Sequence, residues 1–287
     1  TQGMVTHETY RSQAGDWVEP TEIVIETEGN TRRARVASTG EPLVIGDIEK
    51  MSKSKKNVVA PEEIFEAYGV DAARLFVMSD SPPERDVQWT TGGVEGAGRF
   101  VNRVWAEFDA SGPGPSGPDT DPRAEELRRA THKTIKAVTD SIEHFRFNSG
   151  IARLYEFLNI LKGFQAGDAG VANARAEALS VLARLIAPFT PHLAEECWMR
   201  IGGEGMAVDA PWPEADPALT VDAELVLPVQ INGKRRDEVR APADADAATV
   251  EELARANAAV QAYLSANNLS IRKVIVVPGR IVNIVAG

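Results

Sequence analysis

The stretch of this sequence with the clearest chemical potential is a run of cations and hydroxyls at residues 50–56. It places four lysines and two serines in seven residues, with Met51 as the only apolar side chain. Ammonium groups on flexible stems and serine hydroxyls can together bind a highly charged anion, such as a chain of phosphates. The same composition is typical of a solvated surface loop, and composition alone favours that interpretation. The order of the residues and the rest of the chain must decide between the two.

Other residue types that often do chemistry are sparse. The sequence has four histidines, at positions 7, 132, 144 and 192. His192 follows Pro191, so we predict a residue at a helix start rather than a ligand. Glu195 and Glu196 have no evident cleft partner for acid–base work. We expect them to face solvent or to pair with Arg200.

One glycine-rich segment and one cysteine complete the candidates. Residues 92–98 match neither G-x-G-x-x-G nor a Walker sequence, so we interpret them as a flexible lead-in to the next helix. Cys197 is the only cysteine, which excludes an internal disulfide and a Cys-rich zinc site. We predict a small buried side chain on a helix, in a protein of a reducing compartment.

Length, charge and hydropathy narrow the class of protein. The 287 residues could form two or three domains, and the net charge of −11 argues against a protein that coats nucleic acid nonspecifically. Bound RNA would need local patches, and cations cluster at 234–236 and 272–273. The sequence shows no apolar run of membrane-spanning length and no charged-then-apolar leader, so we expect a cytosolic protein without membrane contact. Because it opens at Thr1 as if inside a fold, we expect a fragment.

The lysine-rich run is preceded by β-type sequence. Residues 15–48 are predicted to form a small β-rich insertion. Within it, a β-branched run at 22–26 and a turn at 28–30 lead to a partner strand at 33–36. The lysine-rich run follows this insertion directly.

Two short helices are predicted to follow the run. Pro61 suits a first helical position, and Gly69 suits the end of that helix. Asp71 resembles the N-cap of a second helix, which Pro82 and Pro83 end. For Asp71 and Arg74 we favour a cap with a local salt bridge. The alternative is an active role in transmitting the position of bound RNA to the run.

A series of amphipathic helices is predicted beyond this point. They are separated from one another by short links, and a Pro/Gly connector at 111–122 interrupts them. Their apolar stripes predict burial against one another as a bundle. The predicted helices cover residues 100–108, residues 122–146 and residues 171–187, together with one capped by Asn148 and one that follows Pro191. Phe145 is expected on the apolar side of the helix at 122–146.

The C-terminal part returns to β-type sequence. A strand at 225–231 is followed by Asn232-Gly233, a strong two-residue hairpin signal, and a return strand to Val239. A single helix around 251–264 and a second hairpin with its turn at Pro278-Gly279 complete a β-β-α-β-β pattern.

Several separated segments resemble one family, the bacterial-type leucyl-tRNA synthetases of class I. Lys50-Met51-Ser52-Lys53-Ser54 is similar to the second signature of class I synthetases, a loop that grips the triphosphate of ATP. The segments that resemble the leucine enzymes or the wider Ile/Leu/Val group are residues 3–10, 55–57, 68–76, 89–105, 188–198 and 272–285. The last of these separates leucine enzymes from those for isoleucine, valine and methionine.

The resemblance implies a fold class of α+β, mainly α, in three parts. Residues 1–90 would be the C-terminal remnant of a Rossmann-like class I catalytic domain, which contains the small insertion (15–48), the KMSKS loop (49–57) and the stem-contact helices (58–90). A helical-bundle anticodon-binding domain would cover 91–220. A β-β-α-β-β domain that binds the tRNA elbow would cover 221–287.

The resemblance also implies roles for residues. Lys53 would be the main contact to ATP, Lys50 would support it, Ser52 and Ser54 would donate hydrogen bonds, and Met51 would anchor the loop. Mg²⁺ would arrive with ATP, and no dedicated metal site is expected. The candidate contacts to the phosphates of leucine tRNA are Arg99, Arg103, Lys133, Lys136, Lys234, Arg235, Arg236, Arg272, Lys273 and Arg280.

One departure from the family limits the expected activity. The first signature, His-x-Gly-His, is absent, as are the leucine pocket and the editing domain. We therefore expect a leucine–tRNA ligase fragment, acting as a monomer with ATP, leucine and tRNA as partners, that is inactive alone. The alternatives are a non-catalytic tRNA-binding module and another synthetase of the Ile/Val/Met group.

Overall fold

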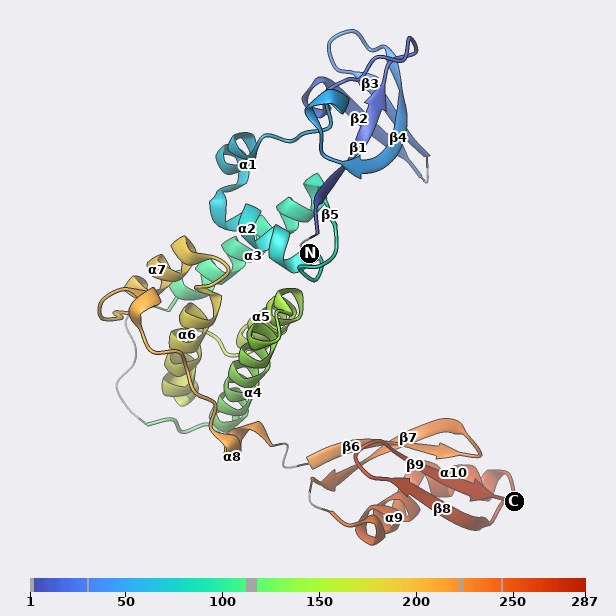
Figure 1. Cartoon of the computed structure of the whole chain (residues 1–287). Coiled ribbons are helices and arrows are strands. Elements are labelled where there is room, and N and C mark those ends of the chain that lie inside the picture. Colours follow the sequence, from blue (N-terminus) through green and yellow to red (C-terminus); the bar gives the residue numbers. More distant parts are fainter. Residues whose placement is uncertain (1–2, 30, 112–117, 222–223, 244) are drawn as a thin grey trace. The chain divides into compact units, whose positions relative to one another are not determined.

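The computed structural model describes residues 3–29, 31–111, 118–221, 224–243 and 245–287. The chain divides into two compact units, Thr1–Asp216 and Pro217–Gly287 (Figure 1). Each unit contains one β-sheet together with helices, so the fold is mixed α/β. Part of the turn predicted at 28–30 and part of the connector predicted at 111–122 lie outside the described residues.

The sheet of the first unit leads directly into the lysine-rich loop. Its order is β2-β3-β4-β1-β5, and only the β1–β5 pair is parallel. The predicted hairpin is present as β2 and β3, and a small core of Tyr10, Ala34 and Leu43 supports the sheet. The strands are β1 (Val5–Arg11), β2 (Ile23–Glu28), β3 (Thr31–Val36), β4 (Pro42–Lys50) and β5 (Val87–Gln88), with a 3-10 turn at Pro20–Glu22.

Three helices connect this sheet to the bundle, and they correct two predictions. Helix α1 (Pro61–Tyr68) begins at Pro61 as expected, but α2 (Val70–Asp80) has Gly69 at its N-cap, so Asp71 does not cap it. Helix α3 (Thr91–Asp109) contains the glycine-rich segment 92–98, which is therefore helical rather than a flexible lead-in. The Thr90 side chain caps α3 by accepting a hydrogen bond from the Gly93 N–H.

The bundle is built from α3 and four further helices. These are α4 (Arg123–Glu143), α5 (Phe147–Leu161), α6 (Ala172–Ile186) and α7 (Pro191–Arg200), followed by the 3-10 turn η4 (Ala207–Asp209). Their apolar stripes meet in one large core, as predicted. Two local predictions are wrong: Asn148 lies inside α5 rather than capping it, and Phe145 is 69% exposed in a left-handed turn between α4 and α5.

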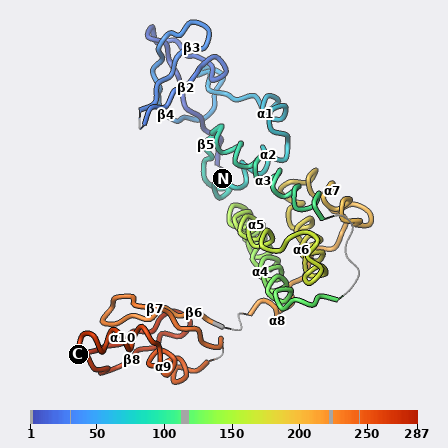
Figure 2. Tube along the Cα trace, turned by 180° about the vertical axis from the view of Figure 1, so that it is seen from behind, coloured from blue at the N-terminus to red at the C-terminus, as the bar shows by residue number. Residues whose placement is uncertain are grey.

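The second unit carries a four-stranded sheet with helices on one face (Figures 1 and 2). Its order is β7-β6-β9-β8, and both predicted hairpins are present. Asn232 and Gly233 have φ of 50° and 79°, the left-handed pair that a tight type I′ hairpin requires. The elements are α8 (Pro217–Thr220), β6 (Glu224–Ile231), β7 (Lys234–Pro242), α9 (Ala247–Ala256), α10 (Ala258–Ala266), β8 (Ile271–Val277) and β9 (Ile281–Ala286).

The single helix predicted around 251–264 is in fact two helices. Asn257 separates α9 from α10 because its backbone is extended and its side chain accepts the Val260 N–H as an N-cap. The Asn257 amide also donates to the Asp237 carboxylate of β7, which fixes the break against the sheet. None of the described helices in either unit is long and apolar enough to cross a membrane.

Candidate functional site

The lysine-rich run forms an exposed loop at the end of β4. Lys50 is the last residue of that strand, and Lys53–Lys55 form a single 3-10 turn. Lys56 adopts a left-handed conformation with φ of 52°, which ends the turn. The Met51 N–H donates to the Val5 carbonyl at 3.2 Å, and the Met51 side chain is half-buried. The loop is therefore attached to β1 beside its first cation.

The lysines of the loop differ in what surrounds them. Lys55 pairs with Glu49, whereas Lys50 and Lys53 are exposed and form no ion pair with any residue that the structure describes. The hydroxyls of Ser52 and Ser54 lie 2.7 Å apart. Among the described residues, three lysines without an ion pair (Lys50, Lys53 and the exposed Lys56) and a pair of hydroxyls thus lie within one short loop. This arrangement is suited to an anionic oxygen-rich ligand.

The strand beneath the loop carries a desolvated histidine. Burial lowers the pKa of His7 below 6.5. The nearby Glu8 carboxylate and a hydrogen bond with the backbone of Asn57 raise this pKa, but they offset the effect of burial only in part. The His7 Nδ1 atom is buried without a hydrogen-bond partner among the described residues. Glu8 in turn binds Arg32 through both carboxylate oxygens, at 2.5 and 2.8 Å, and these bonds lower its pKa.

Asp71 joins the helices after the loop to the bundle. Its carboxylate accepts the Leu193 N–H at 2.7 Å and contacts His192 Nδ1 at 2.9 Å. Arg74 donates to the Pro188 carbonyl instead of pairing with Asp71, so the predicted local salt bridge is wrong. His192 stands at the start of α7, as predicted.

Glu195 and Arg200 of α7 have structural partners, whereas Glu196 is exposed, as predicted. The Glu195 carboxylate accepts the N–H groups of Ala207 and Val208, so it neither faces solvent unpaired nor pairs with Arg200. Arg200 binds Asp109 instead. Cys197 is fully buried as predicted, and burial raises the pKa of its thiol to about 12.

The candidate RNA contacts in the bundle are mostly engaged with neighbours. Arg103 donates to Asn159 at 2.6 Å, and Lys136 pairs with Asp140 at 3.2 Å. Arg99 lies 3.9 Å from Glu95, a loose exposed pair. Lys133 also has an interaction partner. Exposed pairs of this kind contribute little stability, so they leave most of these cations able to contact another anion.

Five of the six candidates in the second unit gather at one end of its sheet. Lys234 of β7 pairs with Ile231 of β6, and Ile231 pairs with Ile284 of β9. Lys273 of β8 pairs with Val285, the residue after Ile284. Arg280 lies at the opposite end, in the turn between β8 and β9. Lys234, Arg272, Lys273 and Arg280 form no ion pair with any described residue, whereas Arg235 pairs with Glu238 and Arg236 stacks on Tyr263.

The sheet face opposite the helices was not predicted as a site. Alternation from the buried residues of each strand places Arg240 and Lys273 on that face. The pairing of Arg235 with Gln230, across a register shift in the β6–β7 pair, places Arg235 there too. Arg240 is exposed and was missed, because its sequence neighbours are acidic or apolar rather than basic. Only the pairing of Arg240 with Val226 across the hairpin reveals its position.

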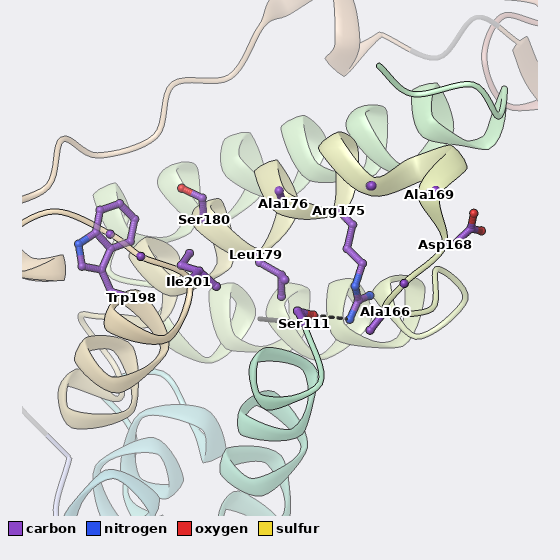
Figure 3. A pocket seen from close by; sticks show the side chains of 14 residues that line it. Ser111, Ala166, Asp168, Ala169, Arg175, Ala176, Leu179, Ser180, Trp198 and Ile201 are labelled. Carbon is purple, nitrogen blue, oxygen red and sulfur yellow. Dashed lines mark hydrogen bonds between the residues drawn. The ribbon is translucent and has the colours of Figure 1, made fainter. Parts of the chain in front are cut away.

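A cavity of about 420 Å³ lies between α6, α7 and the segment that follows α5 (Figure 3). Arg175 lines it, and its guanidinium donates to Glu107 at 2.7 Å and to Ser111 at 3.2 Å. The cavity contains none of the predicted site residues. Within the described part of the chain, no group of three or more His, Cys, Asp or Glu side chains could hold a metal ion.

Comparison with known proteins shows which families this chain is similar to. Residues 41–90 match the family described as tRNA synthetases class I (I, L, M and V), and residues 124–252 match the anticodon-binding domain of tRNA ligase. A leucine–tRNA ligase of Caulobacter vibrioides (strain NA1000 / CB15N) is 66% identical over 100% of this chain. The whole of this chain is therefore similar to part of a leucine–tRNA ligase.

Other leucine–tRNA ligases are similar to this chain as well. The enzyme of Maricaulis maris (strain MCS10) is 55% identical over 100% of the chain, and the chain spans 33% of the length of either relative. Among solved structures, the ternary complex of Agrobacterium radiobacter K84 agnB2 LeuRS with tRNA and LeuAMS is similar with a TM-score of 0.68 and 29% identity. That match covers 83% of this chain and 32% of the other. The resemblance to leucyl-tRNA synthetases inferred from the sequence is confirmed.

Proposed function

We propose that this chain supplies the phosphate-gripping loop and the tRNA-holding parts of an enzyme that joins leucine to its tRNA with ATP. One observation carries the proposal. Lys50 and Lys53 are exposed and unpaired among the described residues, on a loop attached to β1, within a chain 66% identical to a leucine–tRNA ligase. We infer action as a monomer in the cytoplasm from the family resemblance.

The proposed chemistry begins with leucine and ATP. The leucine carboxylate attacks the α-phosphorus of ATP, and pyrophosphate leaves. A hydroxyl of the terminal ribose of the tRNA then takes the leucyl group from the adenylate, which releases AMP. Because negative charge accumulates on the departing pyrophosphate, cations placed beside it lower the barrier. Lys53 is proposed as the main contact and Lys50 as its support. Ser52 and Ser54 would donate hydrogen bonds to phosphate oxygens.

The proposed metal is the Mg²⁺ that accompanies ATP. The loop fits a metal–triphosphate complex as a source of positive charge and of hydroxyl donors. Mg²⁺ held by substrate phosphates requires few protein carboxylates. The metal would neutralise phosphate charge when bound, while the residues of this chain orient the phosphates.

The remaining parts are proposed to hold the tRNA. We propose residues 1–90 as catalytic-domain structure, 91–220 as the anticodon-binding bundle and 221–287 as the elbow-binding domain. The match of residues 124–252 to an anticodon-binding family supports the bundle part of this proposal. Contacts from the ten predicted cations would position the tRNA without reading its sequence, because phosphates carry no sequence information.

The test replaces Lys53 in a full-length ligase that carries this segment. Lys53→Ala should slow leucine-dependent ATP–pyrophosphate exchange by about a hundredfold, a typical loss for one transition-state contact. Binding of leucine tRNA should persist. Lys55→Ala is the matched control, because Lys55 is already paired with Glu49 and should matter far less.

Normal exchange in the Lys53→Ala enzyme would contradict the proposed role of the loop. Retained tRNA binding together with normal exchange would favour a tRNA-binding module in which the lysines have no catalytic purpose.

A further inference from the structure

Asn57 is a polar residue buried beneath a loop of exposed lysines. Its exposed fraction is 1%, and its side chain makes four hydrogen bonds. The Oδ1 atom accepts the Ser52 N–H at 2.8 Å. The Nδ2 atom donates to the carbonyls of His7, Glu49 and Lys50 at 3.3, 3.3 and 3.4 Å.

These contacts determine the orientation of the carboxamide. An amide nitrogen offers two hydrogens and an amide oxygen two lone pairs. The two hydrogens are therefore shared among the three carbonyls, and the partners use both ends of the group. The reverse orientation would set NH₂ against an N–H and an oxygen against three carbonyls. A buried polar group without its partner costs about 1–3 kcal/mol, which disfavours that alternative. The arrangement is therefore specific to asparagine in one orientation.

The carboxamide connects three segments of the backbone. His7 belongs to β1, Glu49 and Lys50 end β4, and Ser52 begins the loop. The left-handed conformation of Lys56 turns the chain so that Asn57 returns beneath its start. Bonds to Lys50 and Ser52 hold the backbone on both sides of Met51.

The loop needs such a connection because its own composition opposes a single conformation. Four ammonium groups within seven residues repel one another, and only Lys55 has an ion-pair partner among the residues that the structure describes. The lysine stems remain free to move, whereas the hydrogen bonds of Asn57 fix the backbone from which Lys50 and Lys53 extend.

We propose that Asn57 is a positioning residue of the ATP site, which sets the backbone of Lys50 to Lys53 for contact with the triphosphate. The inference rests on the proposed function of the loop. It adds a residue that contacts no substrate and acts through the two lysines.

The first test uses this chain and does not depend on catalysis. Asn57→Ala removes all four hydrogen bonds, and Asn57→Asp keeps the acceptor for Ser52 but removes the donors. Amide exchange of Ser52 should be about tenfold faster in Asn57→Ala, the factor expected from losing a buried hydrogen bond. Thr131→Val is the control, because it removes a buried hydroxyl that bonds to Leu127 inside α4. It should leave the exchange of Ser52 unchanged.

The second test measures ATP–pyrophosphate exchange in a full-length ligase carrying this segment. Both Asn57 variants should lower kcat/KM for ATP by about tenfold to a hundredfold, as displaced catalytic groups do, with KM for leucine unchanged. Thr131→Val should change neither constant. A role in stability alone would affect both substrates equally or neither.

Two outcomes would overturn the inference. One is unchanged Ser52 exchange in Asn57→Ala, and the other is a loosened loop with unchanged kinetics for ATP. If Lys53→Ala has normal exchange activity, the proposed function fails instead, whatever the Asn57 variants do to loop protection.

Discussion

The carboxylate of Asp71 caps a helix that begins 120 residues later in the chain. It accepts the backbone N–H of Leu193 at 2.7 Å, at the third residue of α7, and contacts His192 Nδ1 at 2.9 Å. Asp71 is itself in the first turn of α2, close to the lysine-rich loop in sequence. One side chain thereby connects the helices that follow the loop to the bundle.

Removing this cap should destabilise the first unit. We expect Asp71→Ala to lower its free energy of unfolding by about 1–2 kcal/mol, the usual cost of a lost N-cap. Asp71→Asn keeps an acceptor oxygen for Leu193 and should cost less. Urea unfolding followed by tryptophan fluorescence measures this unit alone, because all five tryptophans lie before residue 217.

The control for Asp71 is a cap in the other unit. Asp246 accepts the Thr249 N–H at the start of α9, so Asp246→Ala removes an equivalent interaction. It should leave the tryptophan transition unchanged. An unshifted transition in Asp71→Ala would show that the long-range cap contributes nothing.

Two glycines of α3 should respond to alanine in opposite directions. A Cβ at Gly93 would lie 2.3 Å from Cε2 of the buried Phe76, so Gly93→Ala should destabilise the first unit by about 1–3 kcal/mol through overpacking. A Cβ at Gly98 would meet nothing within 4 Å. Gly98→Ala should stabilise the helix by up to about 1 kcal/mol, because alanine has the higher helix propensity. Thermal unfolding of the two variants tests this, and equal shifts would contradict it.

Stability of the first unit should fall as the pH drops below 6.5. The pKa of His7 is lowered by burial, so in that range the unfolded chain binds a proton that the folded chain does not. Stability is therefore present above pH 6.5 and decreases toward the lower pKa of the folded protein. His7→Gln cannot titrate, so comparing its urea midpoints with wild type from pH 5 to 8 isolates the effect.

Glu8 provides an internal check on that pH dependence. The pKa of Glu8 is lowered chiefly by the bonds to Arg32. Its contribution to stability is therefore present above pH 4.5 and is lost only at more acidic pH. Parallel curves for wild type and His7→Gln between pH 5 and 8 would contradict the His7 prediction.

Deletion of residues 221–287 should separate tRNA charging from the activation of leucine by ATP. In a full-length ligase, the truncated enzyme should charge tRNA poorly while retaining ATP–pyrophosphate exchange, because the second unit folds around its own core. Lys53→Ala should instead lower both exchange and charging while tRNA binding persists, because charging proceeds through the adenylate. Charging and exchange assays on both enzymes test this, and equal losses of both activities on deletion would argue against a tRNA-specific role.

Single cations on the open sheet face should contribute through salt-dependent contacts. Replacing Lys273 with Gln should weaken RNA binding and reduce the slope of log K against log[salt] by about one. Arg255→Gln is a suitable control, because Arg255 pairs with Glu251 on helix α9.

Sequence alone predicted some of the features that follow from neighbouring residues. Pro61 fixes a helix start because its ring presets φ, and Asn232-Gly233 fixes a hairpin because both residues tolerate positive φ. The stripes of the bundle helices predict their burial for the same reason: helical periodicity is local. The order of residues 50–54 also indicated the family before any contact was known.

Tertiary structure decided the partners of the polar residues. Asp71 matches the local signature of an N-cap, but it caps α7, because the path of the chain brings that helix alongside. Glu195 binds the turn at Ala207, and Gly93 is required by Phe76 from another helix. Asn57 resembles an ordinary loop residue in sequence, and only its four backbone partners from β1, β4 and the loop reveal what it holds. Hydrogen bonds between distant segments depend on how the chain packs, which local periodicity does not encode.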